Sequence, residues 1–367
     1  MSGNYGKLLI LDADFLIVGG GVIGLAGAFE LAQSGARVVV LERGVCGRES
    51  SWAGGGILSP LLPWDYSPAV TNLTRLGCEI YPAWVRQVAE ISGIDPEYRR
   101  CGMLVLPDFD EPKAAAWSHA QQVRIDPAQS RDVQPKLGAD TPALWLPDVA
   151  QVRNPRLMKA LRVALERMGV TFKEQAEVIG LAIDAGHIAE IRTASASYRA
   201  DRYVMAAGAW SRQLLGGLGE KVEIGPIRGQ MLLFKAAPGE LQEIVLRNGI
   251  YLIPRADGHI LVGSTLEDVG FDKATTEQAA TALHAQAVDI LPLLADAAVE
   301  RHWAGLRPAS PGNIPIIARH PQVENLYLNG GHFRYGVTMA PASARILANL
   351  VFHRSQPFDI SPYEWPK

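Results

Sequence analysis

The glycine motif G-x-G-x-x-G at 19–24 constrains the fold of this chain more than any other feature of its sequence. It lies between a short apolar run at 15–18 and an apolar stretch at 22–31 with helical spacing, which closes at Gly35, a favoured residue past a helix end. Residues 37–41 are again β-branched and continuous, as in a parallel strand that is buried on both faces. The motif and its flanks therefore predict a β-α-β unit.

Each glycine of the motif has a physical task in a β-α-β unit that binds a dinucleotide. Gly19 permits the tight turn, Gly21 lets the backbone approach a pyrophosphate, and Gly24 allows the helix to pack closely on the strand. The helix N-terminus offers N–H groups and partial positive charge to the phosphates. Glu42 ends the second strand, where its carboxylate is expected to accept hydrogen bonds from the hydroxyls of the adenosine ribose.

A second glycine-rich loop, at 47–57, favours FAD over NAD as the dinucleotide. It combines hydroxyl side chains with three consecutive glycines at 54–56. A large cofactor that extends past the first helix needs nearly bare backbone close to its phosphates and ring system, because side chains would block the approach. A nicotinamide enzyme does not require such a loop at this place.

The rest of the chain alternates between helical and strand patterns. Helices are expected at 67–91, 154–168, about 275–291 and 342–353. Asn154 is the expected N-cap of the second, with Pro155 in its first turn, and Thr275 and Gln278 resemble a capping box at the start of the third. Strands at 178–183 and 188–193 predict a β-meander, joined to a last core strand at 203–206. Strands at 250–254 and 259–262 around Asp257-Gly258 predict a hairpin with a type I′ turn in a separate sheet.

Length and composition predict a two-domain globular protein. The chain has 367 residues, of which 48% are hydrophobic and 20% charged. From element type alone, a mixed α/β fold is expected, with one domain at 14–90, 150–225 and 300–367 and a second, antiparallel domain at 91–149 and 226–299.

Charge and cysteine content exclude several classes of partner. A net charge of −3, with both signs spread along the chain, offers no basic surface for nucleic acid or membrane. Asp12 and Asp14 interrupt the one apolar run near the N-terminus, so we expect a soluble cytoplasmic protein. Three cysteines without a CxxC pair indicate neither a disulfide framework nor a zinc site.

With both glycine loops in view, the chain resembles the D-amino acid oxidase superfamily of FAD enzymes, and within it the bacterial glycine oxidases linked to thiamine biosynthesis. The resemblance runs over nearly the whole chain. Its most specific motifs are the loop at 49–60, AAGAWS at 206–211, GQM at 229–231, YLIPR at 251–255, WAGLRP at 303–308 and GHFRYG at 331–336. It implies a Rossmann-like FAD-binding domain at 14–90, 150–225 and 300–367, with an antiparallel-sheet substrate-binding domain at 91–149 and 226–299.

The resemblance also implies which residues contact FAD. Beyond the motif glycines and Glu42, they are Val22, Ile23, Arg43, Ser50, Ser51, Gly55, Gly56, Ile57, Val178, Gly208, His332, Phe333, Arg334, Tyr335, Gly336, Val337 and Thr338. Trp303 and His332 are expected to pack or hydrogen-bond to the cofactor, with no role in proton transfer. Sarcosine oxidases of the same superfamily attach their flavin through a cysteine in the C-terminal part of the chain. No cysteine follows Cys101 here, so the expected FAD is non-covalent.

For the substrate, the resemblance assigns Arg307 to the arginine that clamps a carboxylate and Tyr251 to the tyrosine that shares it. A planar guanidinium suits this two-point contact better than lysine does. Arg334 matches a second active-site arginine. Tyr335 departs from the small polar residue usual in close relatives, and Leu266 departs from a methionine near the substrate side chain. Either residue is expected to alter which amino acids fit.

The implied reaction is oxidation of glycine by FAD and O₂ to glyoxylate, ammonia and hydrogen peroxide, with no catalytic acid, base or metal. The alternatives are a D-amino acid or sarcosine oxidase, or a quinone-linked dehydrogenase, of the same superfamily. A third alternative is a flavin-binding protein without catalysis, against which the joint presence of Arg307 and Tyr251 argues. Similar glycine oxidases suggest a homo-oligomer.

Overall fold

A six-stranded, mainly parallel sheet forms the centre of one half of the molecule. The structure, a computed structural model, describes residues 7–10 and 13–366; Asp12 and Lys367, named above, lie outside this part. The strands follow the order β10 (Thr171–Lys173), β3 (Val38–Leu41), β2 (Phe15–Val18), β14 (Arg202–Met205), β21 (Leu326–Gly330) and β20 (Ile316–Arg319). Only the β20–β21 pair is antiparallel. The predicted β-α-β unit is confirmed, since β2, α1 (Val22–Gln33) and β3 follow one another and β2 pairs with β3 in parallel.

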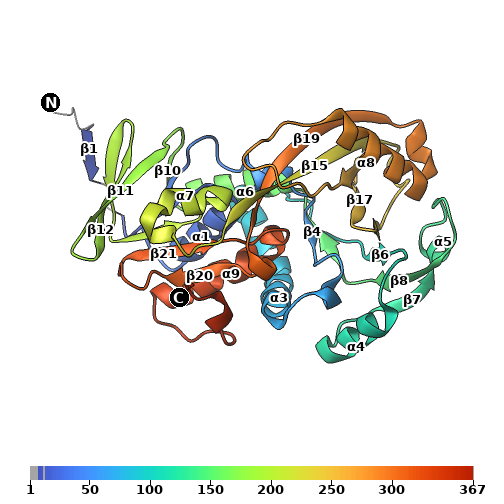
Figure 1. The fold of residues 1–367 in the computed structure, drawn as a ribbon, viewed down its shortest axis with the longest axis horizontal. Helices are drawn as coiled ribbons and strands as arrows, with labels where there is room; N and C mark the ends of the chain where they lie inside the picture. The colour runs from blue at the N-terminus through green and yellow to red at the C-terminus, as the bar shows by residue number, and fades with distance from the viewer. Residues whose placement is uncertain (1–6, 11–12, 367) are drawn as a thin grey trace.

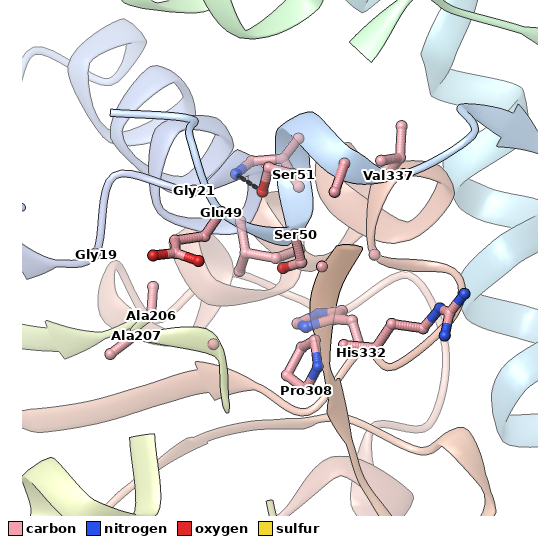
Figure 2. Close-up of a pocket in the computed structure, with 18 of the residues that line it drawn as sticks. Gly19, Gly21, Glu49, Ser50, Ser51, Ala206, Ala207, Pro308, His332 and Val337 are labelled. Atoms are coloured by element: carbon pink, nitrogen blue, oxygen red, sulfur yellow. Dashed lines mark hydrogen bonds between the residues drawn. The ribbon is translucent and has the colours of Figure 1, made fainter. Parts of the chain in front are cut away.

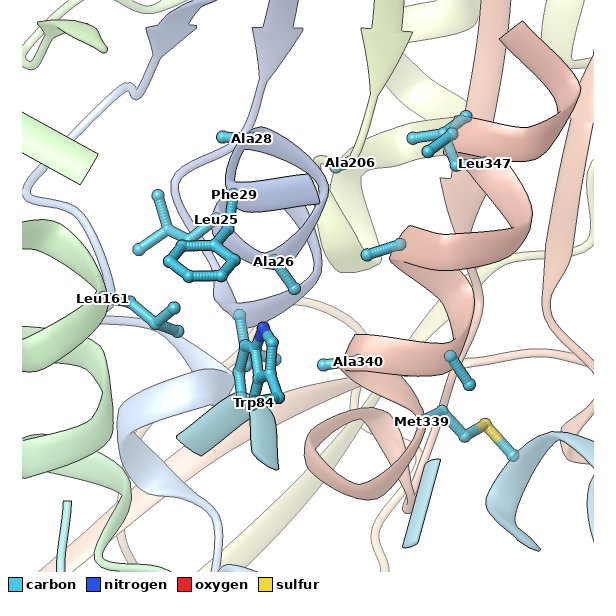
Figure 3. Packing of buried hydrophobic residues seen from close by; sticks show 14 of the residues in the cluster. Leu25, Ala26, Ala28, Phe29, Trp84, Leu161, Ala206, Met339, Ala340 and Leu347 are labelled. Atoms are coloured by element: carbon cyan, nitrogen blue, oxygen red, sulfur yellow. The ribbon is translucent and has the colours of Figure 1, made fainter. Parts of the chain in front are cut away.

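Four helices cover one face of this sheet (Figure 3). They are α1, α3 (Pro68–Ser92), α6 (Asn154–Arg167) and α9 (Gly336–Val351). Helix α1 is apolar on nearly all sides because the sheet and the other helices surround it. The rings of Phe29 on α1 and Trp84 on α3 meet edge to face, with centroids 6.3 Å apart. Burying such a side chain contributes about 1.5–3 kcal/mol, so this layer fixes α1, and with it the glycine motif, on the sheet.

A smaller sheet covers the opposite face. It has four strands in the order β1 (Lys7–Ile10), β13 (Ala196–Arg199), β12 (His187–Thr193) and β11 (Val178–Asp184). Ile188 and Ile191 of β12 pack in one cluster with Leu16 and Val39 of the parallel sheet. The predicted meander is confirmed in β11 and β12, and β13 and β1 extend it by two strands that were not predicted.

The other half of the molecule is built on an eight-stranded sheet (Figure 1). Its order is β19 (Ala298–Ala309), β15 (Gly225–Lys235), β18 (His259–Gly263), β17 (Ile250–Pro254), β16 (Ile244–Arg247), β6 (Met103–Val105), β8 (Pro142–Leu146) and β7 (Asp126–Gln129). All neighbours are antiparallel except β16 and β6. The predicted hairpin of β17 and β18 thus belongs to a sheet separate from the parallel one. The division of the chain at the expected domain boundaries stays a prediction.

Helices and short elements complete the second half and join the two. Helix α8 (Glu277–Ile290) packs on one face of the eight-stranded sheet, and α4 (Glu111–Gln121) lies on the other. The three-stranded sheet β4 (Ile57–Leu58), β9 (Ala150–Gln151) and β5 (Arg99–Arg100) lies at the junction, next to the second glycine loop. The remaining helices are α2 (Ser50–Ala53), α5 (Ser130–Val133) and α7 (Ser211–Leu215).

Two predicted helix starts are wrong. Helix α8 is capped by Thr276, whose hydroxyl accepts a hydrogen bond from the Ala279 N–H at 3.3 Å, so Thr275 is outside the cap. Helix α9 begins at Gly336, six residues before the predicted start at 342. Pro341 interrupts the helical pattern but not the helix. Pro341 lies beyond the first turn of α9 and removes one backbone hydrogen bond, but the surrounding turns are buried.

The predicted cap of α6 and the predicted hairpin turn also differ from the structure. Asn154 lies inside α6 and faces the second glycine loop, as described below. In the β17–β18 turn, the Gly258 N–H donates to the Arg255 carbonyl at 3.0 Å, and Gly258 has a φ of 86° while Asp257 keeps a negative φ. A type I′ turn needs positive φ at both central residues, so the hairpin was predicted correctly with the wrong turn type.

Candidate active site

One cavity of about 450 Å³ lies between the parallel sheet and the eight-stranded sheet. It extends from the glycine turn and Glu42 at one end to Tyr251 and Arg307 at the other. The site residues predicted from the sequence line it except for four, Gly24, Thr338, Trp303 and Leu266. The volume is in the range of ligand-binding sites in proteins. Segments from both ends of the chain therefore meet at a single candidate site (Figure 2).

The glycine turn is as close-packed as the motif predicts. Gly19 has a φ of 115°, and a Cβ there would lie 2.3 Å from the Ala206 carbonyl oxygen. A Cβ on Gly24 would lie 2.0 Å from the Gly19 carbonyl oxygen. Gly24 thus serves the predicted helix packing and takes no part in lining the cavity. At Gly21 the backbone is open, because a Cβ would meet only the Ser51 hydroxyl, at 3.1 Å.

Glu42 lines the cavity at the end of β3 and also organises the turn. Its Oε2 accepts a hydrogen bond from the Gly20 N–H at 2.8 Å, and its Oε1 accepts one from the Gly44 N–H at 2.9 Å. A carboxylate has about four acceptor positions, so two backbone bonds leave capacity for a ligand hydroxyl. The predicted contact with ribose hydroxyls stays a prediction.

Ser51 links the second glycine loop to α1. Its Oγ accepts a hydrogen bond from the Val22 N–H at 2.8 Å, the interaction drawn in Figure 2. One of the N–H groups expected to face a phosphate is therefore already bonded to the protein. Ser50 lies in the same short helix and faces the cavity (Figure 2).

Three side chains that sequence reasoning did not place there hold the second glycine loop from behind. Asn154 Nδ2 donates to the Ser51 carbonyl at 2.9 Å, and the Trp303 indole N–H donates to the Ala53 carbonyl at 3.1 Å. Arg255 is buried and donates to the Gly55 carbonyl at 2.8 Å and to the Val152 carbonyl at 3.0 Å. Burial lowers the pKa of Arg255 to about 10, so it remains a cation at neutral pH. The expected contact of Trp303 with the cofactor is not supported, because Trp303 does not line the cavity.

His332 lies on the cavity wall as a neutral side chain. It is 1% exposed, and its Nε2 is hydrogen-bonded with the Ser343 hydroxyl at 2.7 Å. Burial lowers its pKa to about 3. Its buried Nδ1 has no hydrogen-bond partner in the described part of the chain. A buried nitrogen without a partner beside a cavity is suited to contact a bound group.

Arg307 reaches the opposite end of the cavity from β19. Its Nη1 donates to the Thr265 carbonyl at 3.1 Å and to the Arg228 carbonyl at 3.4 Å, and its Nη2 donates to the Ser264 hydroxyl at 2.6 Å. Within residues 13–366, no carboxylate forms an ion pair with this guanidinium. Burial lowers the pKa of Arg307, and the nearby charge of Arg334 lowers it further. The arrangement is a partly buried cation that forms no ion pair with the described residues.

Gly229 makes room for this guanidinium. It lies on β15, beside β19, and a Cβ there would be 2.1 Å from Arg307 Nη2. The glycine of the GQM motif is thus required by the position of a side chain from another strand.

The remaining predicted substrate residues line the same cavity as Arg307. The Tyr251 hydroxyl lies close enough to interact with the Arg307 guanidinium and favours its charged form, raising its pKa against the effect of burial. Arg334 lines the cavity and makes no ion pair with the described residues. The Tyr335 hydroxyl donates to the Tyr66 hydroxyl, and their rings meet edge to face at 5.0 Å.

Leu266 does not fit its expected place near the substrate side chain. It is 59% exposed and does not line the cavity. The neighbouring Ser264 does line it, together with Leu61 and Met231, which sequence reasoning missed. Met231 belongs to the GQM motif, which did not reveal its place in the cavity, and no local pattern marks Ser264 or Leu61.

Comparison with known proteins identifies the family. The family described as FAD dependent oxidoreductase matches residues 14–350. The chain belongs to this family. Glycine oxidase from Pseudomonas aeruginosa is 45% identical over 353 residues, covering 95% of this chain and 97% of that protein. The resemblance to FAD oxidases drawn from the motifs is therefore confirmed.

Solved structures of two FAD dependent oxidoreductase relatives have the same fold. The crystal structure of glycine oxidase from Geobacillus kaustophilus has a TM-score of 0.91 at 27% identity and covers 97% of this chain and 98% of its own. The crystal structure of iminodiacetate oxidase from Chelativorans sp. BNC1 has a TM-score of 0.87 at 27% identity and covers 95% and 98%. The predicted mixed α/β fold of the D-amino acid oxidase type is confirmed.

The residues of the cavity fit the FAD of this family. The bare turn at Gly19 and Gly21, the carboxylate of Glu42 and the buried Nδ1 of His332 lie along one cavity. The glycine turn would let the backbone approach the phosphates of a dinucleotide, and the carboxylate could accept from its ribose. The buried nitrogen could form a polar contact with the bound group. In the described part of the chain, no helix is both long enough and apolar enough to cross a membrane.

Proposed function

We propose that this chain is a glycine oxidase, which converts glycine, O₂ and water into glyoxylate, ammonia and hydrogen peroxide. The observation that carries the proposal is the partly buried guanidinium of Arg307, which lines the cavity without a carboxylate partner among the described residues. A charge that is partly removed from water is costly unless an anion compensates it, so the site suits a ligand that brings a carboxylate. The 45% identity with a glycine oxidase over nearly the whole chain supports this substrate.

Arg307 has enough free donors to hold the carboxylate at two points. A guanidinium has five N–H groups, and three of them bond to Thr265, Arg228 and Ser264. One N–H on Nε and one on Nη2 remain. Two charge-assisted bonds fix the orientation of a carboxylate as well as its position, and the Tyr251 hydroxyl is close enough to share it.

Side chains around Arg307 restrict the size of the substrate and exclude water. Leu61, Met231 and Tyr251 are buried and line the same cavity. FAD, when bound, accepts a hydride from the substrate α-carbon and passes the electrons to O₂. The task of the chain is to hold the α-carbon in position, and this accounts for much of the catalysis in such reactions.

The charges of the site favour the amine form that can lose a hydride. Once the carboxylate neutralises Arg307, the charge of Arg334 remains nearby and disfavours a second cation. The bound amine should therefore lose its proton more readily than in water. No side chain is needed as a catalytic acid or base, in line with the sequence analysis.

The test is anaerobic addition of glycine to the purified yellow protein. Bleaching of the flavin absorbance, followed by its return when O₂ is admitted, is the expected result. Oxygen consumption with glycine, sarcosine, D-alanine and iminodiacetate then ranks the substrates and separates glycine oxidase from its relatives. If glycine leaves the flavin oxidised but sarcosine or D-alanine bleaches it, glycine is the wrong substrate, and the amino acid that bleaches the flavin replaces it.

The proposal extends to non-covalent FAD, a cytoplasmic location and a homo-oligomer. Non-covalent binding and oligomerisation follow from the resemblance, and the free thiols of Cys46, Cys78 and Cys101 suit a reducing compartment. Light scattering of the purified protein measures the oligomeric state, and fractionation of cells measures the location.

A further inference from the structure

The three groups that hold Arg307 in place come from two separate segments. The Arg228 carbonyl lies on β15, whereas the Ser264 hydroxyl and the Thr265 carbonyl lie just after β18 ends. The direction of the guanidinium therefore depends on how the segment after β18 is held against β15. Any movement between them changes where the two free N–H groups point.

Backbone contacts join the two segments at two places, one of which is the Thr265 N–H donating to the Gln230 carbonyl at 3.4 Å. Arg228 and Glu267 form an isolated bridge, with N–H to carbonyl distances of 2.9 and 3.0 Å in the two directions. The Gln230 N–H also donates to the Thr265 hydroxyl oxygen at 2.8 Å. These bonds hold the backbones of the two segments together. Contacts between their side chains hold them further.

The carboxylate of Glu267 joins the side chains of both segments. It accepts hydrogen bonds from Arg228 Nη2 at 2.5 Å, from Gln230 Nε2 at 2.9 Å and from the Thr265 hydroxyl. Burial alone would raise the pKa of Glu267, but these bonds from Thr265, Arg228 and Gln230 hold it below its ordinary value. The group is therefore a carboxylate with its acceptor positions filled. Arg228 is 4% exposed, so its charge depends on this partner and on Asp272.

We infer that Glu267 is a positioning residue for the substrate clamp: its carboxylate fixes Thr265 and Arg228 and so aims the Arg307 guanidinium at the substrate carboxylate. This inference rests on the proposed function of Arg307. Glu267 does not line the cavity, so it acts through the residues that hold Arg307 and not on the substrate itself.

Asp272 provides a matched control on the same cation. It pairs with Arg228 Nη1 at 2.6 Å but bonds to neither Thr265 nor Gln230. A purely structural role, neutralising the buried Arg228, is shared by both acids. A positioning role belongs to Glu267 alone, because only its carboxylate reaches Thr265.

The experiment compares Glu267→Gln and Asp272→Asn in the FAD-loaded enzyme. The glutamine amide replaces one acceptor oxygen of the carboxylate with an NH2 group, so either Arg228 or the pair of Thr265 and Gln230 loses its acceptor, and we expect the KM for glycine to rise about tenfold while kcat changes little. Acetate, a carboxylate that cannot be oxidised, should lose affinity by a similar factor in calorimetry. Ethylamine, which has no carboxylate, should be oxidised as in the unchanged enzyme. Asp272→Asn should stay close to the unchanged enzyme in all three measurements.

Thr265→Val is a second variant if Glu267→Gln does not fold. It removes the hydroxyl that donates a hydrogen bond to Glu267 and keeps the carbonyl that accepts one from Arg307. It should weaken acetate binding in the same direction. Equal changes in the Glu267 and Asp272 variants, or equal losses for glycine and ethylamine, would overturn the inference. If the unchanged enzyme does not oxidise glycine, the proposed function fails, and acetate binding still decides whether Glu267 positions Arg307.

Discussion

Replacing Arg307 with alanine removes a guanidinium whose N–H groups are divided between the protein and the cavity. Three of its five N–H groups bond to Thr265, Arg228 and Ser264, which leaves two for the substrate. A hydrogen bond to a charged group contributes about 1.5–3 kcal/mol, so two of them contribute about 3–6 kcal/mol. This corresponds to a loss of roughly 10²- to 10⁴-fold in kcat/KM for glycine.

The assay is oxygen consumption with glycine and with ethylamine, for the unchanged enzyme, Arg307→Ala and Arg307→Lys. The lysine variant should recover only part of the activity, because a point charge cannot reproduce a two-point contact. Both variants should stay yellow, since Arg307 lies at the end of the cavity away from the glycine turn. Losses of the same size for glycine and ethylamine would refute the carboxylate clamp and leave Arg307 with a structural role.

Four further predictions follow from the same site. Gly229→Ala should displace the Arg307 guanidinium, because the new Cβ would lie 2.1 Å from its Nη2. The KM for glycine should therefore rise while the melting temperature changes little, and an unchanged KM would contradict this. Glu42→Ala should bind FAD about tenfold more weakly, roughly 1.4 kcal/mol, measured by titration of the apoprotein, with substrate ranking unchanged. Acid precipitation should release all the flavin, and a yellow pellet would reject non-covalent binding. Because the pKa of His332 falls from 6.5 to about 3 on folding, the unfolded chain binds a proton there between these pH values and the folded chain does not. The free energy of unfolding should therefore drop as pH falls through this window, by at most ~5 kcal/mol, and denaturant titrations should show a smaller drop for His332→Asn.

Local physics explains why the sequence alone identified the β-α-β unit and the cofactor end of the cavity. The glycine spacing, the helical period of α1 and the β-branched run of β3 each act within a few residues, so they can be recognised without knowing the fold. The motifs around Glu42, Ser51 and His332 are recognisable for the same reason, since each is a contiguous run with its own composition. All three residues lie on the cavity, although the fold brings them there from distant parts of the chain.

Errors of prediction occurred where a distant contact overrides a local preference. Asn154 has a good N-cap composition, but its amide instead bonds to Ser51, which is 103 residues earlier. Helix α9 continues through Pro341 because its first turns are buried against α3 and the sheet, and this burial outweighs one lost hydrogen bond. Leu266 departs from the methionine of its relatives and was expected near the substrate side chain, but it projects into solvent.

The sequence by itself determined the class of fold and the dinucleotide turn, and its resemblance to a family assigns the substrate carboxylate to Arg307 and Tyr251 as a prediction. Only the tertiary structure decided what holds them. Ser264 and Glu267 are unremarkable in their local sequence, and the GQM motif marks Gly229 without showing its task. The roles of all three come from β19, β15 and the end of β18 lying side by side. The physical reason is that a guanidinium without an ion pair can be partly buried only where several chain segments supply acceptors together, and no single segment records that arrangement.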